Sequence, residues 1–153
     1  MTAASLTWDY EYQIEHDGNS CAYWITAIRS EAVFDQRRSW VRPEHRRPEI
    51  LAHEQGHFDL TQIYKRLMDE RAAELIGSRR HCEGDTIEQA SSFTQRDAAE
   101  SVQAVFDAIW TRYMSAQREY DAQTSHGIAA GSQRRWSDRI RAGLESGTWP
   151  DSA

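Results

Sequence analysis

The chain has 153 residues, and its 18 basic and 24 acidic side chains leave a net charge of −6. This length suits one domain with its own core, and we expect a single domain over residues 1–149 with a short tail at 150–153. The basic residues are scattered among acidic ones, which argues against nucleic acid as a partner. No apolar run approaches the ~18 residues that a membrane-spanning helix needs, so we expect no membrane span.

The first part of the chain, about residues 5–34, predicts an antiparallel β-hairpin. Apolar and polar residues alternate at its start with the period of two that is typical of a half-buried strand. The apolar members are Leu6, Trp8, Tyr10 and Tyr12. A turn at 17–20 follows, and residues 21–34 are long enough to return as the partner strand, with room for a bulge. The arginine-rich segment 35–47 predicts a solvated connector.

The main chemical signal is the H-E-x-x-H spacing formed by His53, Glu54 and His57. Residues four apart share one face of an α-helix, so His53 and His57 can bind one zinc ion through neutral ring nitrogens. Glu54 beside them can then act as general base toward water on the ion. The alternative is a helix whose two histidines only pack or form hydrogen bonds.

Helical spacing of apolar residues extends on both sides of this motif. The motif helix is expected to run from Pro48 to Ile76, with Gly77 as its stop. Thr86 and Gln89 resemble a capping box that opens a second long helix. The apolar stripe of that helix is more typical of a core than of a cofactor site.

A loop is expected over residues 120–127, followed by a last helix over about 129–144. The helical part of the chain would therefore cover about residues 47–145. The fold class predicted is α+β, a small N-terminal antiparallel hairpin or sheet packed on three main helices.

A catalytic zinc ion needs a third protein ligand. The acidic residues Glu70 and Glu74 lie on the motif helix itself, roughly 20 Å or more from the ion, and cannot reach it. His126 is our first choice, because it stands in the expected polar loop with Asp121 and Thr124 available to orient it. Asp121 itself is the alternative if His126 only forms a turn. The remaining candidates are His45, His81, Asp97, Glu100 and Asp107.

Two cysteines, Cys21 and Cys82, stand far apart in the sequence and form no C-x-x-C pattern. One possibility is a disulfide that joins the N-terminal segment to the connection after the motif helix, worth on the order of 4 kcal/mol. The other is a pair of buried free thiols. The sequence leaves both open.

The string His53-Glu54-Gln55-Gly56-His57-Phe58-Asp59, followed downstream by Tyr120-Asp121, Thr124, His126-Gly127, Gln133 and Trp136, resembles the DUF922 family of predicted secreted zinc-dependent bacterial proteases. The resemblance implies a zincin-like metallopeptidase with zinc ligands His53 and His57, the base Glu54 and a functional role for His126. It also implies export to the periplasm or beyond, which would suit a disulfide. The first residues lack the features of a signal peptide, so a cytoplasmic location stays open.

The predicted activity is hydrolysis of peptide bonds, with a peptide or protein as substrate and the oligomeric state open. One zinc ion held by His53, His57 and His126 would polarise the carbonyl, and Glu54 would move the proton. Tyr120 is the candidate donor to the oxyanion, the alternative being a tyrosine that packs the end of a helix. Asp59 is expected to orient a ligand histidine.

Two competing functions remain. The first is a zinc-containing binding or structural module without peptidase activity, and the second is a metal-free helical adaptor. The intact Glu54 beside the first histidine argues against a purely structural site, which needs no carboxylate there.

Overall fold

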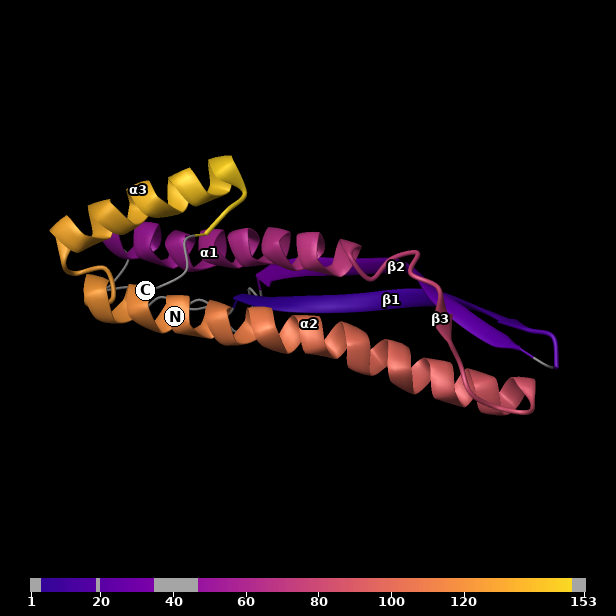
Figure 1. Ribbon diagram of the computed structural model, residues 1–153. Helices are drawn as coiled ribbons and strands as arrows, with labels where there is room; N and C mark the ends of the chain where they lie inside the picture. Colours follow the sequence, from indigo (N-terminus) through magenta and orange to yellow (C-terminus); the bar gives the residue numbers. More distant parts are fainter. Residues whose placement is uncertain (1–3, 19, 35–46, 150–153) are drawn as a thin grey trace. The chain divides into compact units, whose positions relative to one another are not determined.

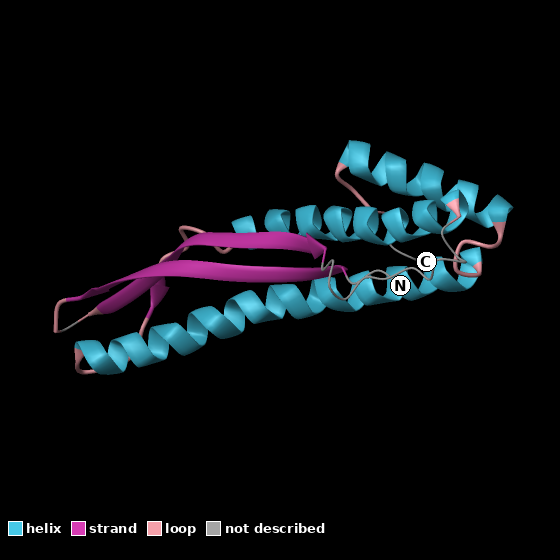
Figure 2. Cartoon of the chain, turned by 180° about the vertical axis from the view of Figure 1, so that it is seen from behind, coloured by secondary structure: helices cyan, strands magenta, loops and turns pink. Residues whose placement is uncertain are grey.

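The structure is a computed structural model that describes residues 4–18, 20–34 and 47–149 (Figure 1). The elements in chain order are β1 (Ala4–His16), β2 (Cys21–Phe34), α1 (Pro48–Ala73), β3 (Arg80–His81), α2 (Ile87–Thr124) and α3 (Ala130–Ser146). The strands form one antiparallel sheet in the order β1-β2-β3, and Figure 2 distinguishes them from the three helices. This arrangement confirms the α+β class, with an N-terminal hairpin followed by three main helices. Most of the expected connector, with the candidate ligand His45, lies outside the described residues.

The chain divides into two compact units. Unit 1 comprises Met1–Thr7, Glu31–Leu67 and Ile109–Ala153, and unit 2 comprises Trp8–Ser30 and Met68–Ala108. Helices α1 and α2 contribute residues to both units. In the described part of the chain, no helix combines the length and the apolar composition that crossing a membrane requires.

The core of unit 2 forms where β2 and β3 pack on the first half of α2. Tyr23 of β2 is fully buried, and its hydroxyl donates a hydrogen bond to Asp97 of α2. Arg80 of β3 lies 3.5 Å from the same carboxylate and also donates to Ser101. These contacts give the buried Tyr23 hydroxyl a hydrogen-bond partner, and a buried hydroxyl without one would destabilise the fold. On β1, Trp8 stacks on a phenylalanine of α2, so one face of the hairpin is covered by this helix.

A disulfide joins Cys21 and Cys82, whose Cα atoms are 5.0 Å apart. It continues the pairing of β2 with β3, in which Ala22 stands opposite His81. The sequence left a disulfide and two free thiols open, and the structure contains the disulfide. Because it closes a loop of 61 residues, its contribution to the free energy of unfolding is roughly 4 kcal/mol by the loop-entropy argument.

The ends of α1 and α2 show how far local sequence signals determine helix limits. The capping box at the start of α2 is confirmed, because Thr86 and Gln89 exchange two side-chain to backbone hydrogen bonds of 3.3 Å. Helix α1 ends at Ala73, earlier than the expected Ile76. The reason is that Ile76 forms a bridge with Ile25 of β2, and this pairing replaces the last helical turn.

Unit 1 contains the first part of α1, the last part of α2 and all of α3, which lies along α1 (Figure 1). Gly143 of α3 permits this close approach, since a Cβ atom there would lie 2.9 Å from Ile63 of α1. The expected last helix is confirmed to within two residues at each end. The expected loop over 120–127 is wrong in its first part, because α2 continues to Thr124.

The continuation of α2 has a physical cause in the packing of unit 1. Buried positions recur along the helix at helical spacing up to its end, at Tyr113, Ala116, Tyr120 and Thr124. The Thr124 hydroxyl also donates a hydrogen bond of 2.6 Å to the carbonyl of Tyr120, one turn earlier. Asp121 is therefore a helical residue and not a loop residue.

Candidate metal centre

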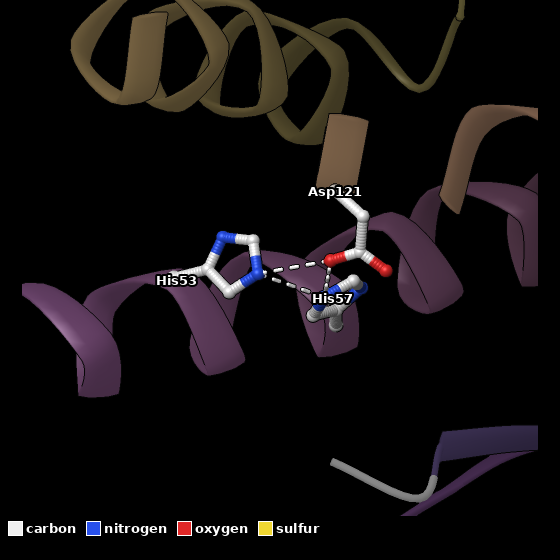
Figure 3. A group of neighbouring side chains, drawn as sticks. All are labelled: His53, His57 and Asp121. Carbon is white, nitrogen blue, oxygen red and sulfur yellow. Dashed lines mark hydrogen bonds and ion pairs between the residues drawn. The ribbon is translucent and has the colours of Figure 1, made fainter. Parts of the chain in front are cut away.

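Three side chains of unit 1 converge on one point: His53 and His57 of α1, and Asp121 in the last turn of α2 (Figure 3). The two Nε2 atoms lie 3.1 Å apart. Asp121 Oδ1 lies 3.1 Å from Nε2 of His53 and 3.0 Å from Nε2 of His57. The four-residue spacing on a helix brings the two imidazoles together, as the sequence predicts, and the group could hold a metal ion.

The chemistry and spacing of these donors fit a tetrahedral metal site. An ion with bonds of about 2.0–2.1 Å in tetrahedral geometry has its ligand atoms roughly 3.3 Å apart. The observed separations of 3.0–3.1 Å come within a few tenths of an ångström of that value. Two imidazole nitrogens and one carboxylate oxygen are also donors that divalent transition metals accept. The described residues therefore place three donor atoms at a spacing that could hold a metal ion.

Burial differs between the two sides of this triad. His53 is buried, with 2% of its surface exposed. The side chain of Asp121 is 35% exposed, and His57 is half-buried. Among the described residues, Asp121 is therefore the most exposed member of the triad.

Each histidine is also held through its other ring nitrogen by a glutamine. Nδ1 of His53 lies 3.2 Å from Oε1 of Gln133, on α3. Nδ1 of His57 contacts Oε1 of Gln117, on α2. The sequence assigned no role to either glutamine. Gln117 lies one helical turn before Asp121, so treating that part of α2 as helix would have identified it. Gln133 stands in the string that resembles the DUF922 family, but its contact with His53 depends on tertiary packing.

Protonation of His53 is disfavoured in the folded chain. Burial lowers the pKa of His53 below its ordinary value of 6.5, and the neighbouring charge of His57 acts in the same direction. The contacts with Gln133 and Asp121 oppose this shift without cancelling it. Since metal coordination requires a neutral imidazole, the shift favours the metal-binding form of His53.

Tyr120 is fully buried and forms part of the wall of the site. Its ring stacks on His53 with centroids 4.5 Å apart, and its hydroxyl donates a hydrogen bond of 3.0 Å to the carbonyl of His53. Burial raises the pKa of Tyr120 to about 12, although a hydrogen bond from Gln133 acts in the opposite direction. Because its proton is already donated to a backbone carbonyl, this geometry favours a packing role for Tyr120 over donation to a substrate.

His126 lies in an unusual turn beside the triad. Ser125, His126 and Gly127 all have positive φ angles, of 48°, 54° and 87°. Such backbone is strained for residues other than glycine and persists only where the surrounding structure enforces it. Gly127 is forced close to the site, since a Cβ atom there would lie 2.8 Å from Cβ of His53.

This turn places Nδ1 of His126 3.2 Å from Oδ1 of Asp121, while the His126 side chain stays 76% exposed. Its ring nitrogens do not belong to the group whose ligand atoms lie within 4.8 Å of one another. The structure thus brings Asp121 into the triad, with His126 as a neighbour of that carboxylate. Thr124, expected to orient His126, contacts Nδ1 of His53 at 3.3 Å instead.

The other residues singled out from the sequence have different surroundings. Glu54 follows His53 on α1 and is half-buried. Asp59 accepts a hydrogen bond of 2.7 Å from Gln55, one turn earlier on the same helix. Among the alternative ligands in unit 2, Asp97 accepts from Tyr23, and His81 belongs to strand β3.

A search of protein-family models, of curated proteins and of solved structures finds no match to this chain.

Proposed function

We propose that the chain is a zinc-dependent metallopeptidase of a minimal zincin-like type, with His53, His57 and Asp121 as ligands. The observation that carries the proposal is the convergence of three ligand atoms within 3.1 Å of one another, beside the Glu54 of an H-E-x-x-H helix. Asp121 takes the place that we first expected for His126. Membership of the DUF922 family stays a prediction from the motif strings.

The ligand set supports zinc and a catalytic site over a purely structural one. Two imidazoles and one carboxylate are a common ligand set of catalytic zinc, and three protein ligands leave one position for water or substrate. Structural zinc sites are usually closed by four protein ligands, mostly cysteines. Both cysteines of this chain are in the disulfide and cannot serve as ligands.

In this proposal, a bound zinc ion would polarise the substrate carbonyl and lower the pKa of water toward about 7. Glu54 accepts a proton from the attacking water and returns it to the leaving amine. His53 and His57 stay neutral and hold their positions through the two glutamines. The exposed side of Asp121 is the side from which a peptide enters.

The test combines metal analysis with a peptide-library assay on the purified chain and on Glu54→Gln. We expect about one zinc ion per chain in both proteins. Cleavage should occur with the unmodified chain and be lost in Glu54→Gln, because only the proton acceptor is removed. Glu70→Gln, an exposed acid on the same helix, is the matched control and should cleave like the unmodified chain.

Absence of bound metal would overturn the proposal. Bound metal without any cleavage would instead support a zinc-containing binding module. An oxidising compartment such as the periplasm or the extracellular space suits the Cys21–Cys82 disulfide, and we propose export on that basis.

A further inference from the structure

The orientation of Gln117 is determined by the backbone of the histidine that it contacts. Its Nε2 donates a hydrogen bond of 3.0 Å to the main-chain carbonyl of His57. A carbonyl oxygen can only accept, so the amide nitrogen must face it and the amide oxygen must face the ring. That oxygen contacts Nδ1 of His57. Since an amide oxygen also only accepts, Nδ1 of His57 must carry the proton.

The proton of His53 can be placed in the same way, with Tyr120 as an additional residue between the His53 carbonyl and Gln133. The carbonyl of His53 accepts the hydroxyl proton of Tyr120 at 3.0 Å. The Tyr120 oxygen then accepts from Nε2 of Gln133 at 2.7 Å, which turns Oε1 of Gln133 toward Nδ1 of His53. The hydroxyl of Thr124 donates its proton to the carbonyl of Tyr120. Like Oε1 of Gln133, it can therefore only accept a hydrogen bond from Nδ1 of His53. Nδ1 of His53 must therefore carry the proton.

We propose that Gln117 and Gln133 are positioning residues that fix both ligand histidines in the Nδ1–H tautomer before any metal binds. Each chain of hydrogen bonds starts at the backbone carbonyl of a histidine and ends at the ring of the same histidine. This inference deepens the proposed metal site and rests on it for its function. The side chain of a free histidine in water prefers the opposite tautomer, with the proton on Nε2, so the protein must impose the Nδ1–H form.

The Nδ1–H tautomer of both histidines determines which atoms face one another at the centre of the triad. With both protons on Nδ1, the Nε2 atoms of His53 and His57 carry lone pairs, and Asp121 Oδ1 carries another. Three acceptors then lie 3.0–3.1 Å apart without a proton between them. Such groups repel one another, and a bound cation removes the repulsion. The glutamines thus prepare the site for a cation and orient its ligands, as residues outside the ligand set commonly do.

The direct test is long-range ¹H–¹⁵N NMR of the metal-free, ¹⁵N-labelled chain at a pH above the ordinary range of histidine titration. This spectrum distinguishes the two neutral tautomers. We expect the Nδ1–H form for His53 and His57. The exposed His81 serves as an internal reference and should show the tautomer mixture of a free histidine side chain, in which the Nε2–H form predominates. An Nε2–H pattern for either ligand in the metal-free chain would overturn the inference.

Variants give a second test. Gln117→Met keeps the length of the side chain but removes the acceptor, so His57 should change to the Nε2–H form while His53 stays unchanged. Its zinc affinity, measured by competition with a chelator, should fall by about 10–100-fold. Gln103→Met, an exposed glutamine on the same helix, is the matched control and should leave both measurements unchanged.

These outcomes separate the two proposals. If the unmodified chain binds no zinc, the proposed function fails, whatever the tautomers are. If the chain binds zinc but Gln117→Met leaves the tautomer of His57 and the zinc affinity unchanged, only the positioning role fails. The tautomers of the unmodified chain decide the inference even if a variant does not fold.

Discussion

Substituting Gly56, between the two ligand histidines, should destabilise the chain even though glycine is a poor helix former. In an ordinary helix interior, Gly→Ala stabilises by about 1 kcal/mol. Here a Cβ atom would lie 2.2 Å from the hydroxyl oxygen of Tyr120 and 2.7 Å from its Cζ. Tyr120 is fully buried and its hydroxyl is hydrogen-bonded on two sides, so it cannot move without breaking those bonds.

The magnitude follows from three contributions. Overpacking costs about 1–3 kcal/mol, and leaving a buried hydrogen-bonding group without its partner costs about another 1–3 kcal/mol. The gain in helix propensity offsets about 1 kcal/mol of this. We therefore expect Gly56→Ala to lower the free energy of unfolding by about 1–5 kcal/mol. Zinc affinity should fall as well, because Tyr120 connects His53 to Gln133.

Urea denaturation of the metal-free chain measures this difference. The matched control is Gly131→Ala on α3, where the nearest heavy atom to the new Cβ is the end of the Arg135 side chain at 3.8 Å. That variant should be as stable as the unmodified chain or more stable by up to about 1 kcal/mol. If Gly56→Ala behaves like Gly131→Ala, the close packing of Tyr120 on the motif helix is not what holds the site together.

Three further predictions concern the ligands, the disulfide and pH. Asp121→Ala should remove most of the bound zinc. His126→Ala should weaken zinc binding by about 10–100-fold, and this variant should still bind one ion per chain at saturation. If both variants lose zinc affinity equally in a chelator competition, His126 is also a ligand. Replacing Cys21 and Cys82 together by serine should lower the free energy of unfolding by roughly 2–5 kcal/mol, measured in urea, and no change would mean that the disulfide carries no stability. The metal-free chain should lose stability as the pH falls below 6.5, because the pKa of His53 is lowered in the folded state and the unfolded chain binds the proton first. In His53→Gln, the part of the stability loss at low pH that is due to His53 should disappear. If the dependence of stability on pH is the same in this variant as in the unmodified chain, His53 is not its cause.

Local patterns in the sequence were sufficient to predict the motif helix and the convergence of His53 and His57 on one of its faces. The spacing of His53 and His57 places them on one face wherever the segment is helical, and the apolar residues around them made it helical. The capping box at Thr86 was equally local, since both of its hydrogen bonds join residues three apart. Such features need no knowledge of the rest of the fold.

The third member of the triad, Asp121, could not be identified from local patterns. The residues around Asp121 are polar and resemble a loop, but burial of Tyr120 and Thr124 against their neighbours keeps them helical. Once the helix extends that far, Asp121 faces the two histidines and His126 follows in a left-handed turn. Tertiary packing therefore determines that Asp121, and not His126, joins His53 and His57 in one group.

The triad joins distant parts of the chain, because His57 and Asp121 are 64 residues apart in sequence. An ion that binds both of them binds the folded state and not the unfolded chain. By mass action it would then act as a folding ligand, adding about 4 kcal/mol of stability at a free concentration 1,000 times its dissociation constant. For the proposed metallopeptidase, the concentration of free metal would therefore set both the peptidase activity and the fraction of chains that are folded, and a chelator would lower both together.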